Sequence, residues 1–119
     1  MKITSGAIDQ LEHFSQFKTV EDFQRHVKKI LVDYNNVFIN GDQMALQMLA
    51  LFSHEIPGVS NPSIASVVKA SNEYVCLKPI SRSTFKRMIQ KAKAFGLLTV
   101  FETEKENGYQ LSNLYIFNK

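Results

Sequence analysis

The stretch that decides the fold is SRSTFKRMIQKAKAFGLL, residues 81–98. Ser81 is a strong candidate for a helix N-cap, because its side chain can accept a hydrogen bond from a free N–H of the first turn. An apolar stripe at helical spacing follows: Phe85, Met88, Ile89, Ala92 and Phe95. Gly96 is the expected stop, since glycine readily adopts the left-handed conformation that ends many helices. The stretch therefore predicts an amphipathic helix from Ser81 to Phe95.

The sequence after Gly96 changes to a strand-like pattern. The segments Leu98–Thr103 and Leu114–Phe117 are rich in residues that favour strands, and Asn107-Gly108 between them is the strongest short hairpin signal. The polar tip of this hairpin, Glu104–Gln110, is expected to project from the molecule.

A two-residue turn at Asn107-Gly108 fixes the register of the predicted hairpin. It places Leu98 opposite Phe117 and Val100 opposite Tyr115. Apolar cross-strand pairs of this kind stabilise the base of a hairpin, so we expect these pairs to hold it against the helices.

The sequence before Ser81 predicts further helices. They are a short helix over Ile8–Phe17, a helix capped by Thr19 and running to about Tyr34, a helix from Asp42 to about His54, and a short helix opened by Asn61-Pro62 that fades near Ser71. The helix that begins at Asp42 is apolar nearly all round, so we expect it to be the central, buried one. A loop over 72–80 leads to Ser81.

The stretch from Ser81 to Leu98 resembles the recognition helix and first wing strand of bacterial winged helix-turn-helix proteins. The matching positions are Ser81, Thr84, Arg87, Ile89, Gly96, Leu97 and Leu98. The hairpin return at Gly108 and Ser112–Tyr115 is similar to the wing of plasmid and phage replication initiators and regulators, and Ile64-Ala65 resembles the start of the helix before the recognition helix. The chain departs from the family at Ala92, where leucine is usual, and in the length of loop 72–80.

The resemblance and the element order give one fold class: mainly α with a small β-hairpin, a winged helix-turn-helix with an N-terminal helical extension. We place the extension at residues 1–38 and the winged domain at 39–119. With 119 residues, the chain is long enough for one modest core. The implied function is binding of double-stranded DNA, as a transcription regulator or a replication accessory factor of a plasmid or phage.

The charge distribution supports a polyanion partner. The formal net charge is only +3, but residues 74–101 contain no Asp or Glu. All the basic residues of that segment lie in or near the predicted helix: Lys78, Arg82, Lys86, Arg87, Lys91 and Lys93. A block of one sign indicates a candidate surface for DNA. The alternative interpretation is a solvated helix face.

An α-helix fits the major groove, where its first two turns reach base edges. The predicted DNA-binding residues are Lys78, Arg82, Ser83, Thr84, Lys86, Arg87, Gln90, Lys91 and Lys93. Among these, Arg82 and Lys86 are the candidates for base contacts, and Ser83 and Thr84 for phosphates near the helix N-terminus. Arg87 suits either role, and the other lysines suit non-specific phosphate attraction.

A second hypothesis is a protein-interaction adaptor that uses the winged-helix fold to bind a host replication or regulatory protein. Glu102, Glu104 and Glu106 make the predicted wing acidic, which disfavours contact with phosphates and favours a protein partner at the wing or the N-terminal helices. We also predict a homodimer, because the first forty residues carry more apolar side chains than a three-helix domain requires.

Other classes of function are disfavoured. A single cysteine, Cys76, excludes an internal disulfide, and His13, His26 and His54 show no metal-binding spacing. No phosphate loop or catalytic motif is present, so we expect no cofactor, no metal and no enzymatic activity. The start of the chain is unlike a signal peptide. The longest apolar stretch, Met44–Phe52, is too short to span a membrane, so we expect a cytoplasmic, nucleoid-associated bacterial protein.

Overall fold

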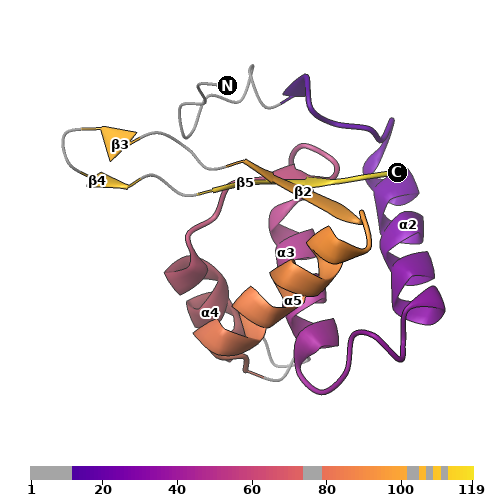
Figure 1. The fold of residues 1–119 in the computed structure, drawn as a ribbon. Helices are drawn as coiled ribbons and strands as arrows, with labels where there is room; N and C mark the ends of the chain where they lie inside the picture. The colour runs from indigo at the N-terminus through magenta and orange to yellow at the C-terminus, as the bar shows by residue number, and fades with distance from the viewer. Residues whose placement is uncertain (1–11, 74–78, 102–104, 107–108, 111–112) are drawn as a thin grey trace.

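The computed structural model describes residues 12–73, 79–101, 105–106, 109–110 and 113–119. Its elements, in order, are α2 (Val20–Asp33), α3 (Asp42–Phe52), β1 (Val59–Ser60), α4 (Ile64–Glu73), α5 (Arg82–Ala94), β2 (Leu98–Phe101), β3 (Lys105–Glu106), β4 (Tyr109–Gln110) and β5 (Leu114–Phe117). Within the described residues, four helices accompany a three-stranded antiparallel sheet of order β1-β5-β2 (Figure 1). This small mixed α/β arrangement is compatible with a winged-helix-like topology.

Helix α5 forms where the sequence predicts it. The Ser81 side chain accepts a hydrogen bond from the Thr84 N–H at 3.1 Å, and Phe85, Met88, Ile89 and Ala92 are buried. The helix ends at Ala94, followed by the C-cap Phe95 and by Gly96, whose φ is +72°. The Leu97 N–H donates to the Ala92 carbonyl at 2.9 Å. The predicted cap, stripe and stop are therefore confirmed.

Phe95 does not share the burial of the rest of this stripe. It is half exposed, and its ring packs against Tyr34 at a centroid distance of 5.4 Å. Phe95 is the C-cap of α5 and so lies beyond the last residue of the helix.

The helices before α5 agree with the sequence except at some of their ends. The Thr19 side chain caps α2 as predicted, accepting from the Asp22 N–H at 3.1 Å. The predicted start of α4 at Asn61-Pro62 is wrong, because Ser63 is the residue whose side chain accepts from the Ser66 N–H, at 3.0 Å. Ser63 offers the same capping chemistry two residues later, and α4 continues to Glu73 instead of fading near Ser71.

The predicted helix over Ile8–Phe17 falls partly on residues that the structure does not describe. Where it is described, Ser15 to Phe17 are not helical. The Ser15 hydroxyl donates instead to the Pro57 carbonyl at 2.7 Å. Phe17 packs edge-on against Phe23 at 5.2 Å, so this segment is held by contacts with the rest of the chain.

The sheet has the register that the sequence predicts. Leu98 pairs with Phe117 and Val100 with Tyr115. The strand β1 was not predicted; it pairs with the other edge of β5 and is only two residues long, too short for an alternating pattern to show. The predicted turn at Asn107-Gly108 lies outside the described residues, although β3 and β4 on either side of it pair.

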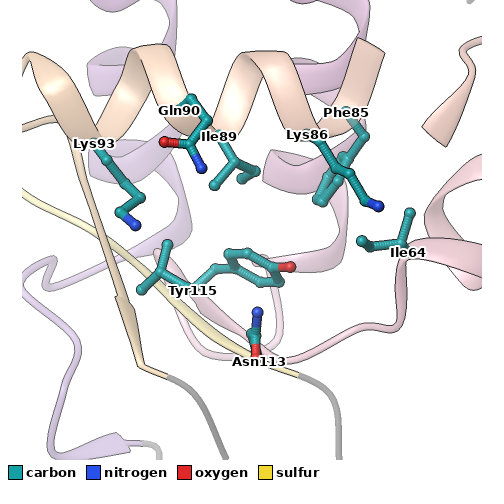
Figure 2. Close-up of a pocket in the computed structure, with 9 residues that line it drawn as sticks. Ile64, Phe85, Lys86, Ile89, Gln90, Lys93, Asn113 and Tyr115 are labelled. Carbon is teal, nitrogen blue, oxygen red and sulfur yellow. The ribbon is translucent and has the colours of Figure 1, made fainter. Parts of the chain in front are cut away.

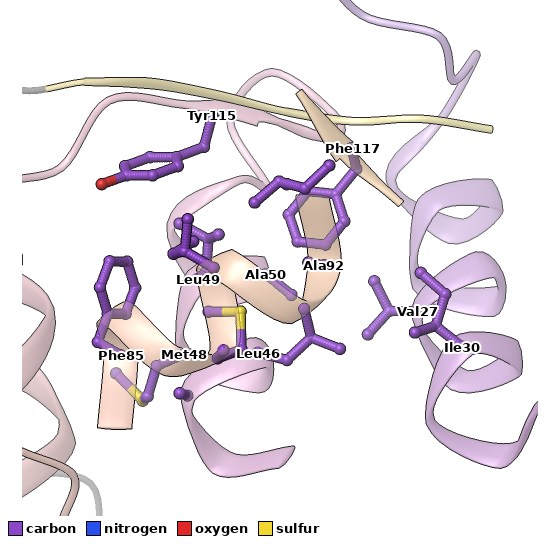
Figure 3. Packing of buried hydrophobic residues seen from close by; sticks show 14 of the residues in the cluster. Val27, Ile30, Leu46, Met48, Leu49, Ala50, Phe85, Ala92, Tyr115 and Phe117 are labelled. Atoms are coloured by element: carbon purple, nitrogen blue, oxygen red, sulfur yellow. The ribbon is translucent and has the colours of Figure 1, made fainter. Parts of the chain in front are cut away.

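The main core lies between the helices and one face of the sheet. Tyr115 and Phe117 point towards the helices (Figure 3), where Phe117 meets the ring of Phe23 at 4.9 Å. The alternate residues Leu114 and Ile116 belong to a separate cluster, which Phe14 covers. Both faces of the central strand β5 are therefore buried.

Helix α2 shares the main core with α3 and α5. Phe23, Val27 and Ile30 are buried there together with Phe17. These are among the apolar residues that motivated the predicted dimer, and they are used within the chain. Dimerisation and the division at residue 38 both stay predictions.

Candidate nucleic-acid interface

One side of α5 presents exposed polar and basic side chains. Arg82, Lys86 and Lys93 lie four and seven residues apart, a spacing that repeats on one side of a helix, and Gln90 stands beside them. All four are exposed. In the part of the chain that the structure describes, the three cations form no ion pair. We call these four residues the open face of α5.

Ser83 is exposed in the first turn of α5, whereas the neighbouring Thr84 is half-buried and contacts residues of the protein itself. Its hydroxyl lies 3.0 Å from that of Ser81. Its methyl group would stand 3.0 Å from a Cβ added to Gly41. Thr84 thus packs against the start of α3, while Ser83 keeps a free surface position. Lys78 lies outside the described residues.

The other predicted cations of α5 contact a buried carboxylate. Asp42, the first residue of α3, has 0% of its surface exposed. Its Oδ1 accepts from the Arg87 Nε at 2.8 Å, and its Oδ2 accepts from the Lys91 Nζ at 2.5 Å. Lys91 also donates to the Val37 carbonyl at 2.8 Å. We call Arg87 and Lys91 the anchored face of α5.

The electrostatics of the anchored face favour ionised Asp42. Burial by itself raises the pKa of this carboxyl, because a low-dielectric environment disfavours charge. Hydrogen bonds from Lys91 and Arg87, together with their positive charges, outweigh burial and lower the pKa below its ordinary value. The anchored face therefore joins α5 to α3 through a charged cluster, and its cations are partly neutralised.

Asp42 is the residue that sequence reasoning missed. The only sign in the sequence was that an acidic residue begins a nearly apolar helix. An aspartate in the first turn of a helix is also common for an ordinary reason, since it interacts favourably with the helix dipole. Two of the nine predicted DNA-binding residues thus have a structural partner that the sequence did not reveal.

A pocket lies beside the open face. It has a volume of about 430 Å³ and is bounded by α5, the first residue of α4, and the strands β2 and β5. Figure 2 shows Lys86 and Lys93 extending from α5 at the two ends of the pocket, with Tyr115 and Asn113 opposite the helix. The open face thus borders a concave surface.

The strand side of the pocket carries two polar groups. Burial raises the pKa of the Tyr115 hydroxyl, and a hydrogen bond with the Asn113 side chain acts in the opposite direction. Tyr115 is therefore neutral at physiological pH. The Asn113 Oδ1 is buried and has no hydrogen-bond partner among the residues described.

The predicted acidic wing can be followed only in part. Glu102 and Glu104 lie outside the described residues, and Glu106 belongs to β3. In Figure 1, β3 and β4 lie well away from the helices, at the far end of the hairpin from α2. The position of β3 and β4 agrees with the projection expected from the sequence, while a partner for the wing stays a prediction.

The described residues contain no cluster of three or more His, Cys, Asp or Glu side chains placed to hold a metal ion. None of the helices there has the length and apolar character needed to cross a membrane.

Comparison of the chain with protein-family models, with curated proteins and with solved structures gave no match.

Proposed function

We propose that the chain is a non-enzymatic winged-helix protein that binds double-stranded DNA through the open face of α5. The observation that carries the proposal is the row of Arg82, Lys86 and Lys93, exposed along one side of the helix without an ion-pair partner among the described residues. Cations in such a row can neutralise successive phosphates or reach base edges when a helix enters the major groove.

The three cations of the open face and the neighbouring Ser83 each have a role in this proposal. Arg82 and Lys86 lie in the first half of α5 and would contact base edges, with guanine as the favoured partner. Ser83 would bind a phosphate near the N-terminus of the helix, where backbone N–H groups also favour anions. Lys93, in the last turn, would contact the backbone without regard to sequence. A transcription regulator and a replication accessory factor would both use this surface.

The anchored face supports the same proposal indirectly. The Asp42 cluster joins α5 to α3, so the open face is carried on a helix with a fixed orientation. Arg87 is still partly exposed and could touch a phosphate, whereas Lys91 is more buried and makes two hydrogen bonds inside the protein. We therefore assign DNA contact chiefly to the open face.

The proposal is tested by measuring affinity for a pool of random duplexes at two salt concentrations. DNA binding should weaken steeply with salt, because cations that contact phosphates displace condensed counterions. The variant Arg82→Ala/Lys86→Ala should bind much more weakly. Lys28→Ala/Lys29→Ala is the matched control, since it removes the same charge from exposed positions on α2. An equal loss of DNA affinity in both variants would show that only net charge matters, and it would contradict the assignment of DNA binding to the open face.

The adaptor hypothesis keeps one structural observation in its favour. Phe95 is half exposed at the end of α5, beside Tyr34 and away from the open face. Exposed aromatic residues are common centres of protein interfaces. Negligible affinity for duplex DNA at low salt would favour this second function.

A further inference from the structure

The pocket beside α5 combines an apolar wall with two separated cations. Phe85, Ile89 and the ring of Tyr115 are buried side chains that form its inner wall. Lys86 and Lys93 are exposed and stand at its two ends (Figure 2). A volume of about 430 Å³ lies within the range of sites that bind small organic molecules. The pocket thus has both a surface for a ring and charges for anionic groups.

The spacing of the lysines restricts the ligand. Their Cα atoms are seven residues apart on one helix, which corresponds to about 10 Å along its axis. Two ammonium groups on side chains that start this far apart are better matched by two anionic groups on one ligand than by one. Between them, Gln90 and Asn113 offer amide groups that can donate or accept hydrogen bonds.

We propose that this pocket binds a molecule that carries a flat ring together with two separate anionic groups. The ring lies against Tyr115 and Ile89, and the anionic groups meet Lys86 and Lys93. Two sources share this chemistry: a free aromatic dicarboxylate, and a nucleoside flanked by two phosphates within a nucleic-acid strand. Because the open face supplies both lysines, occupancy by the free molecule competes with DNA. The competition rests on the function proposed above, whereas the binding itself does not.

The test is to titrate the protein with four probes and to measure binding by NMR chemical-shift changes and by calorimetry. Terephthalate is compared with benzoate, and thymidine 3′,5′-bisphosphate with thymidine 5′-monophosphate. The two-anion member of a pair should bind about tenfold more tightly, since a second charge-assisted contact is added. Lys86→Gln and Lys93→Gln should each abolish that preference. Arg82→Gln is the control, because Arg82 belongs to the open face but does not line the pocket.

The outcomes separate the two sources. A preference for terephthalate over benzoate supports the proposal and identifies a free effector. A preference confined to the thymidine pair supports it and identifies a strand of nucleic acid. Equal binding of one-anion and two-anion probes, no binding of any probe, or a preference that survives both lysine substitutions overturns it.

The same variants distinguish this proposal from the proposed DNA function. Arg82→Gln should weaken duplex binding while leaving terephthalate binding unchanged. If the protein binds no duplex but retains the two-lysine preference, the DNA function fails and the pocket assignment stands. If duplex binding depends on Arg82 and no probe binds, the pocket assignment fails alone.

Discussion

Helix α5 carries two basic faces with different environments. On the anchored face, Arg87 and Lys91 contact the fully buried Asp42. On the open face, Arg82, Lys86 and Lys93 are exposed, and no ion pair involves them among the described residues. The same two residue types in one helix therefore serve packing on one side and remain available to a partner on the other. A count of positive charges along the sequence does not separate these roles.

The difference has an energetic basis. A buried carboxylate must be paired, because an unpaired charge in a low-dielectric environment is costly. Exposed cations without partners contribute little to folding, since water already solvates them. Substitutions on the anchored face should therefore change stability, and substitutions on the open face should change binding.

The largest expected effect is that of Asp42→Ala. Removing the carboxylate leaves Arg87 and Lys91 facing a gap at the start of α3, so the free energy of unfolding should fall by about 3 kcal/mol. This is the lower end for buried pairs, because Arg87 is partly exposed. Urea denaturation measures the change, with the exposed Asp33→Ala as the control. An effect of Asp42→Ala no larger than that of the control would contradict the assignment of a structural anchor.

On the open face, Arg82→Ala and Lys86→Ala should each weaken binding to a selected duplex about tenfold or more, as the loss of a good base contact does. Base preference should relax at the contacted position. Because both side chains are exposed, the midpoint of urea unfolding should stay nearly constant. Binding isotherms on specific and random duplexes provide the measurement. A folded double variant with unchanged affinity would exclude α5 as the DNA-reading helix.

Measuring stability as a function of pH tests the charge of the anchored face without removing the Asp42 side chain. Folded Asp42 has a lowered pKa, so the unfolded chain takes up its proton first as pH falls. The stabilisation it provides is present at neutral pH and is lost below about pH 4, where an unperturbed aspartate titrates.

The readout is the difference in unfolding free energy between the wild type and Asp42→Asn. This difference should shrink as the pH is lowered from about 6 to about 3, because only the wild type has this carboxylate to protonate. A difference that stays constant with pH would show that charge is unimportant at this position.

Much of the local structure follows from short signals in the sequence. The limits of α5 follow from the N-cap Ser81, the apolar stripe and Gly96 with its positive φ. Each of these signals depends only on residues close in the sequence. The register of the hairpin base follows in the same way from the two-residue turn expected at Asn107-Gly108, which pairs Leu98 with Phe117 and Val100 with Tyr115. The predicted start of α4 was wrong. Asn61-Pro62 and Ser63 carry competing start signals, and in the structure the Ser63 side chain accepts from the Ser66 N–H.

The candidate site was less accessible to sequence reasoning. The contacts of Asp42 with Arg87 and Lys91 span 45 and 49 residues, so no local pattern reports them. The pocket likewise depends on how α5, α4 and the sheet are placed together. The sequence could supply the list of basic residues in α5, but dividing them into two faces required the position of α3.

The smallest expected effect comes from a matched pair of lysines. Lys91 and Lys93 are two residues apart, which places them on different sides of α5, and only Lys91 contacts Asp42. Lys93→Ala should weaken binding to all duplexes alike, by a few-fold, and should reduce the slope of log affinity against log salt by about one unit, as the loss of a single phosphate contact does. Lys91→Ala should instead lower the midpoint of urea unfolding, and its salt slope should stay close to that of the wild type. The two variants remove the same charge, so any difference between them reflects the position of the lysine on the helix and not the net charge of the protein. If both variants reduced the salt slope equally and neither lost stability, the two faces would be equivalent and the distinction between them would fail.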